Sequence, residues 1–183
     1  MRKRLAIVLA VVIVAVQGPF SYAQDQSTYA LTSEQLSVIK TNCQSVQSTL
    51  TRIHTNDALS RVHLGQEYET LSTKFMAPMN SRVALAKLDG VAMTKTTVEF
   101  NTKLTRFRQQ YQQYEQSLLR TLQMKCAEDP SGFYDAVVQA SENRSSVRDI
   151  VLELGELVTL YHAQVLELRT QTIAGKQPTE VAQ

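Results

Sequence analysis

The chain has 183 residues, of which 43% are hydrophobic and 20% charged, and its formal net charge is +2. This length is sufficient to bury one hydrophobic core. Six glycines and four prolines exclude a collagen-like or wholly disordered chain, and two cysteines exclude a disulfide-rich miniprotein or a four-cysteine zinc module.

Residues 1–23 are typical of an export signal. Met1–Arg4 is basic, Leu5–Val16 is an unbroken apolar run, and Ser21 and Ala23 supply the small residues that signal peptidase prefers. As a helix, the apolar run would span roughly 18 Å, well short of the ~30 Å hydrocarbon core of a membrane. We expect cleavage after Ala23 and a periplasmic or secreted protein; the alternative is an uncleaved membrane anchor.

Removal of this segment changes the charge balance. Three of the 19 lysines and arginines lie within it, which leaves 16 bases against 17 acids and a net charge of −1. A chain with this charge has no general attraction for polyanions. We therefore expect no nucleic acid partner, and a membrane contact only if the segment is retained.

The folded domain is predicted to cover residues 32–170, after a flexible polar leader at 24–31. Thr32 and Gln35 have the spacing of a capping box, which starts a helix. Apolar residues then recur at alternating steps of three and four, the heptad pattern of a helix that packs along another: Leu36, Ile39, Cys43, Val46, Leu50 and Ile53. Thr55–Asp57 predicts a turn or sharp kink, with Asp57 as the N-cap of a second helix.

The second helix is predicted to end at Asp89–Gly90 and to be kinked or split by Pro78. A third should run from about residue 94 to residue 127. Asp129 and Pro130 then supply an N-cap followed by proline at the first helical position, which starts a fourth helix. The periodicity stops near residue 170, and we expect a disordered tail over 171–183.

No segment alternates with the period of two that marks a β-strand. The sequence therefore predicts an all-α fold, an antiparallel bundle of about four long, heptad-patterned helices with short connections.

Cys43 and Cys126 both lie on apolar seams, as two buried thiols or a disulfide would. An oxidising compartment favours the disulfide. However, straight helices with turns near residues 56 and 91 would place the two cysteines roughly 20 Å apart along the axis, whereas the Cα atoms of a disulfide lie within about 7 Å. A disulfide therefore requires a kink, a tilt or a displaced turn.

No local motif indicates an enzyme. The chain lacks a Gly-x-Ser-x-Gly elbow, a phosphate-binding glycine loop and a Cys-x-x-Cys pair. His63 and Glu67 lie one helical turn apart, but we interpret them as a solvated surface pair, and Glu153 and Glu156 likewise. We expect no catalytic, metal-binding or cofactor-binding residues, although a triad assembled from distant residues stays open.

Gly65 and Gly155 lie inside predicted helices, where each glycine costs about 1 kcal/mol relative to alanine. We expect close packing to explain both. On this interpretation, Gly65→Leu would destabilise the fold by overpacking.

Residues 106–116 interleave aromatic and basic residues with glutamines. Tyr111 and Tyr114 share one helical face, which is either part of the core or, if one helix is missing from the core, an exposed groove. Tyrosine and arginine are common anchors of protein interfaces. The candidate partner surface therefore consists of Arg106, Arg108, Tyr111 and Tyr114.

The run Leu31–Gln35 reads Leu-Thr-Ser-Glu-Gln and resembles the LTxxQ motif of small all-helical periplasmic chaperones of the envelope stress response. The match covers five residues, the family's second copy of the motif is missing, and Thr-x-x-Gln is also an ordinary capping box. The resemblance implies a chaperone that holds unfolded clients.

Taken together, these patterns predict an exported, non-catalytic helical-bundle protein that acts through protein–protein interaction or self-association in the cell envelope or outside the cell. The alternatives are a periplasmic holdase-type chaperone and a membrane-anchored helical envelope protein.

Overall fold

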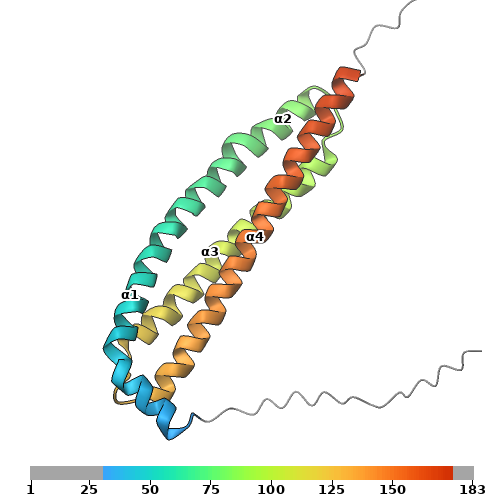
Figure 1. Ribbon diagram of the computed structural model, residues 1–183. Coiled ribbons are helices and arrows are strands. Elements are labelled where there is room, and N and C mark those ends of the chain that lie inside the picture. The colour runs from blue at the N-terminus through green and yellow to red at the C-terminus, as the bar shows by residue number, and fades with distance from the viewer. Residues whose placement is uncertain (1–30, 175–183) are drawn as a thin grey trace, which may run out of the picture. The chain divides into compact units, whose positions relative to one another are not determined.

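The computed structural model describes residues 31–174, and all the regular structure in this range is helical. The predicted signal segment, most of the predicted leader and residues 175–183 lie outside it. Helix α1 (Ser33–Thr70) continues through the π-helical segment η1 (Leu71–Met76) into α2 (Ala77–Leu85), followed by α3 (Val91–Gln123) and α4 (Pro130–Ala174) (Figure 1). We refer to α1, η1 and α2 together as the first rod. Among residues 31–174, no helix is both long enough and apolar enough to cross a membrane.

Helices α3 and α4 share the most extensive helix–helix interface. They run in opposite directions, because Thr121 contacts Ala136 while Lys103, nearer the start of α3, contacts Glu153 further along α4. Asp129 begins α4 by accepting a hydrogen bond from the Gly132 N–H at 2.9 Å. The helix continues to Ala174, so the predicted boundary between domain and tail at residue 170 falls within it.

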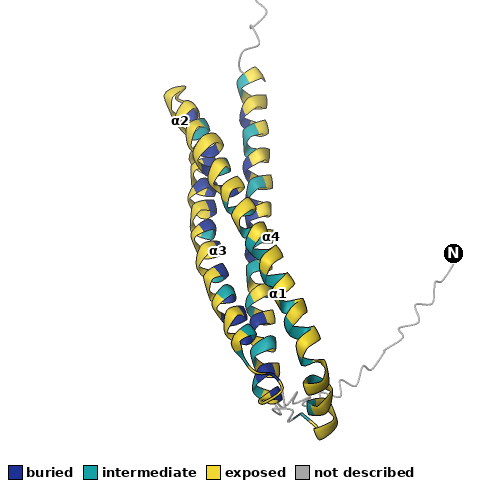
Figure 2. Ribbon diagram, turned by 90° about the vertical axis from the view of Figure 1, so that its left-hand side faces the viewer, coloured by how far each residue is buried: buried dark blue, intermediate teal, exposed yellow. Residues whose placement is uncertain are grey.

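The core has two clusters of buried side chains. The larger includes the fully buried Phe100 and Leu154, and the Tyr68 ring packs edge-on against Phe100 and Phe107 with centroids 6.0 and 5.9 Å apart. The smaller contains Tyr111, Tyr114, Leu118 and Ala140. In α1, which is described along its whole length, Tyr68 alone is buried. Figure 2 shows this contrast, with a row of buried residues along α3 and mostly partly buried or exposed residues along α1.

The predicted turn at Thr55–Asp57 is wrong. Helix α1 passes through these residues without interruption, so the structure has three long helical rods in place of about four helices. Asp57 does not cap its own backbone; its carboxylate binds Tyr114 of α3 and Arg144 of α4. These tertiary partners outweigh the weak preference of Asn and Asp for helix ends.

Without that turn, the two cysteines come into register. The first rod and α3 are joined through residues 86–90, and contacts between them run from Asn80 with Thr97 to Asp57 with Tyr114. Continued in the same sense, this register brings Cys43 level with Cys126. The two form a disulfide with Cα atoms 5.7 Å apart, beside a 2.8 Å hydrogen bond from Gln47 to the Met124 carbonyl.

Pro78 neither splits nor ends the first rod. The six residues before Ala77 form a π-helix, in which the Ala77 N–H donates to the Ser72 carbonyl five residues earlier. Proline removes one backbone donor from a helix, and a π-helical turn rearranges the hydrogen bonds there. The rod thus accommodates Pro78 through a local change of helix type.

Gly65 lies inside α1 and Gly155 inside α4, and neither is a site of close packing. A Cβ atom placed on Gly65 or Gly155 would have no neighbouring atom within 4 Å, so the predicted close packing at both is wrong. The expected overpacking in Gly65→Leu loses its basis for the same reason. Gly90, between α2 and α3, is different because a Cβ there would lie 2.7 Å from the Val83 Cγ1 atom.

We expect Gly65→Ala to raise the free energy of unfolding by about 0.5–1 kcal/mol, because alanine loses less backbone entropy in a helix and has free space here. The matched substitution Gly90→Ala should lower it by roughly 1 kcal/mol, since the buried Val83 side chain must move. Urea denaturation measures both changes. Changes of the same sign in the two variants would contradict this assignment.

Candidate binding site between the three rods

The structure separates the four residues of the predicted partner surface. Tyr111 and Tyr114 are 3% and 2% exposed and belong to the core. The first rod covers this face of α3, so of the two alternatives left open by the sequence, a core face and an exposed groove, the structure has the core face. Arg106 and Arg108 are exposed, and Arg108 pairs with Glu69 of α1. A partner contact at these two arginines stays a prediction.

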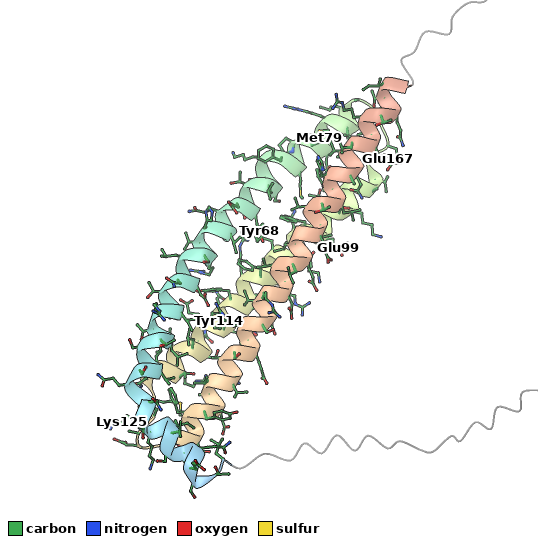
Figure 3. All side chains as sticks on the ribbon, viewed as in Figure 1. Tyr68, Met79, Glu99, Tyr114, Lys125 and Glu167 are labelled. Atoms are coloured by element: carbon green, nitrogen blue, oxygen red, sulfur yellow. A yellow bond between two sulfur atoms is a disulfide. The ribbon has the colours of Figure 1, made fainter. Side chains whose placement is uncertain are left out.

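Asp57 links all three rods through its carboxylate. The Tyr114 hydroxyl donates to Oδ2 at 2.6 Å. The Arg144 guanidinium donates to Oδ2 from Nε at 2.7 Å and to Oδ1 from Nη2 at 3.0 Å. Such a bidentate arginine–carboxylate pair is both stronger and more directional than a single hydrogen bond. Figure 3 shows Tyr114, together with Tyr68 of α1, between the first rod and the α3–α4 pair.

These contacts set the charge states of the network. Burial by itself raises the pKa of the Asp57 carboxyl, but the hydrogen bonds from Arg144 and Tyr114 outweigh it, and the pKa lies below its ordinary value. Burial and the hydrogen bond to Asp57 raise the pKa of the Tyr114 hydroxyl. The hydrogen bonds to Asp57 also raise the pKa of Arg144. At neutral pH the network thus contains a carboxylate, a neutral phenol and a guanidinium.

A cavity of about 380 Å³ lies beside this network and receives side chains from all three rods. Its apolar lining is formed by Leu64, Phe107, Val147 and Val151, together with the Tyr111 ring. Three arginines, Arg61, Arg144 and Arg148, and one acid, Asp57, supply its charges. Ser60, Ser141 and Ser145 also contribute, so the lining mixes apolar side chains with polar and charged groups. A concave site with apolar side chains and convergent polar groups can hold a small molecule.

The arginines of the cavity differ in their partners. Arg144 is paired with Asp57, and Arg148 bonds to Ser145 at 3.3 Å and lies 3.7 Å from Asp149. Arg61 places its guanidinium carbon 4.9 Å from the centroid of the Tyr111 ring, a cation–π contact. Its Nε atom is buried and has no hydrogen-bond partner among the described residues.

Sequence reasoning found the two tyrosines but missed this site. The local sequence predicts Asp57 only as the N-cap of a helix, and it gives no prediction for Arg61 one turn later. Arg144 and Arg148 lie one helical turn apart in α4, but both are exposed and share their face with Ser141 and Ser145, so the sequence carries no signal that marks them as part of a site.

The described residues offer no comparable cluster of metal ligands. Within residues 31–174, no three His, Cys, Asp or Glu side chains are grouped so that they could hold a metal ion. His63 and Glu67 form a 3.2 Å pair on the exposed face of α1. Glu153 pairs with Lys103 of α3 at 2.6 Å.

Comparison of the chain with protein-family models, with curated proteins and with solved structures finds no significant match.

Proposed function

We propose that this is an exported protein that acts by binding another protein through the apolar seam of α1. The seam consists of Leu36, Ile39, Cys43, Val46, Leu50 and Ile53. One observation carries the proposal: the seam has a regular heptad pattern, yet each of its six residues is only partly buried. Cys43 is bonded to Cys126 and Leu50 packs against the smaller core cluster, so the seam faces α3 and α4 but is covered incompletely by them. A partner helix would pack against the part left uncovered, with anchors at the same spacing.

Photo-crosslinking tests this contact in the exporting host. A photoreactive amino acid in place of Ile39 should crosslink the protein to a partner or to a second copy. The same amino acid at Thr41, which is exposed on the opposite face of α1, is the matched control. Identical crosslinked species from both positions, or none from position 39, would refute binding through the seam.

Sedimentation velocity then separates self-association from binding of a different protein. A seam used between two copies predicts a dimer fraction that rises with protein concentration and that Ile39→Asp abolishes. Thr41→Asp adds the same charge on the opposite face and should leave the dimer unchanged. A protein that stays monomeric while position 39 crosslinks would identify a different partner.

A second candidate, a holdase-type chaperone, is favoured by a separate groove. This groove of about 390 Å³ lies between α4 and the η1–α2 part of the first rod, and its lining is mostly apolar: Leu71, Phe75, Met76, Met79, Val158 and Val165. Phe75 is 61% exposed, and methionine side chains adapt to varied clients. This role predicts that the protein suppresses aggregation of reduced lysozyme. Phe75→Ser should weaken the suppression, whereas Ile39→Asp should not.

Export is part of the proposal and can be tested independently. The disulfide is compatible with an oxidising compartment. The intact mass of protein recovered from the exporting host should correspond to a chain that begins at Gln24 and lacks two hydrogens relative to its reduced form. A full-length mass would favour the membrane-anchored alternative.

A further inference from the structure

We propose that the cavity between the three rods binds an amphipathic organic monoanion, a single-chain or single-ring carboxylate, with its carboxylate on Arg61 and its apolar body against Leu64, Phe107 and Val151. This inference is independent of the partner proposed for the α1 seam. It rests on the charge, the lining and the size of the cavity.

The charge argument follows from the pairing of the arginines. Asp57 neutralises Arg144. Arg148 lies beside Asp149, and the side chains of Arg148 and Asp149 are both mostly exposed. Arg61 has no carboxylate partner within residues 31–174, and its Nε atom is buried without an acceptor. The terminal Nη atoms of Arg61 are not among the buried unpartnered atoms and form no hydrogen bond within the described residues, so they are the donors that a ligand can reach. A carboxylate in the cavity would accept from these Nη atoms and balance the charge of Arg61.

The choice of a carboxylate follows from the shape and number of the groups. A guanidinium presents its donors in a planar fork that matches the two oxygens of a carboxylate. Among the described residues, Arg61 is the one arginine of the cavity that forms no salt bridge with an acid, so a single negative charge is sufficient. The Tyr111 ring holds the Arg61 guanidinium in place by its cation–π contact.

The apolar lining and the volume define the rest of the ligand. Leu64, Phe107, Val147 and Val151 offer hydrocarbon on all three rods. A volume of about 380 Å³ lies near the lower end of the ~300–1,000 Å³ found for small-molecule sites. This size favours one chain or ring over a lipid with two chains. Ser60, Ser141 and Arg148 also line the cavity and are exposed, so a ligand can enter from solvent.

Calorimetric titration of the disulfide-bonded protein with decanoate tests the proposal. We expect saturable binding of one decanoate per chain. Decanol has the same chain without the charge and should bind at least about tenfold more weakly, as expected for the loss of a charge-assisted hydrogen bond. Arg61→Met should weaken decanoate binding by a similar factor. Arg52→Met, an exposed position on α1 outside the cavity, is the matched control and should bind as the wild type does.

Three results would overturn the proposal: no saturable binding of decanoate, equal affinity for decanol and decanoate, or unchanged affinity in Arg61→Met. Circular dichroism establishes that each variant is folded. If Arg61→Met does not fold, Val151→Phe takes its place, because it fills the cavity from α4 without changing a charge. If decanoate binds Val151→Phe as tightly as it binds the wild type, its site lies outside the cavity, and the proposal is contradicted.

Discussion

Replacing both Cys43 and Cys126 with serine is expected to lower the free energy of unfolding by about 4 kcal/mol. The disulfide closes a loop with a sequence separation of 83, and the chain-entropy model assigns a loop of this size roughly 4–5 kcal/mol. At about 2–4 °C per kcal/mol for a domain of this size, the melting temperature should fall by roughly 10 °C. Urea denaturation and thermal melting of the oxidised protein and the double variant measure the two quantities.

Wild-type protein in reductant is the matched control and should unfold like the double serine variant. Limited proteolysis gives a second measurement. Because the α1 seam is only partly buried, the N-terminal part of α1 depends on the disulfide to stay attached to α3 and α4. Loss of the bond should therefore expose α1 to cleavage before α3 or α4. Equal unfolding midpoints with and without reductant would show that the bond contributes nothing.

Asp57→Ala should lower the free energy of unfolding by about 2 kcal/mol at pH 7. The substitution leaves the buried Tyr114 hydroxyl without its acceptor and the Arg144 guanidinium without its carboxylate, and it removes the contact that joins all three rods. Asp149→Ala is the matched control. Its carboxylate is mostly exposed and, among the described residues, pairs only with neighbouring Arg148, so we expect a change below about 0.5 kcal/mol.

The effect of Asp57 should depend on pH in a defined direction. Its folded-state pKa lies below the unfolded-state value, so its contribution to stability is fully present above about pH 5. The contribution is lost as the pH falls through the unfolded-state and then the folded-state pKa. The stability difference between wild type and Asp57→Asn should therefore be constant near neutral pH and shrink below about pH 4. A difference that stays the same at pH 3 would contradict the assigned ionisation.

The features that sequence could predict are those decided by neighbouring residues. The capping box at Thr32 forms as predicted, with hydrogen bonds of 2.8 and 3.3 Å between Thr32 and Gln35. The α4 start at Asp129 is likewise local. The spacing of the apolar residues predicts an all-helical fold. The structure confirms this prediction over residues 31–174.

The features that sequence missed depend on contacts between distant residues. The local sequence predicts Asp57 as the N-cap of a helix, but its partners Tyr114 and Arg144 are 57 and 87 residues away. Because α1 continues through residues 55–57, Cys43 and Cys126 lie level with each other and not the roughly 20 Å apart that a turn there would impose. Arg61 was missed for the same reason, because its place beside Tyr111 is visible only once α1 is known to continue past residue 57.

The π-helical segment has a consequence for how the chain tolerates changes in length. In this segment the Ala77 N–H bonds to the carbonyl five residues earlier instead of four, so the segment holds about one residue more than an α-helix that turns through the same angle. Buried residues stand on both sides of it, Tyr68 before and Val83 after. Deleting one residue between Leu71 and Met76 would let a regular α-helix form with α2 still turned the same way, so Val83 would keep facing the core. Deleting one residue from α2 ahead of Val83 would instead rotate Val83 by about 100° away from the core.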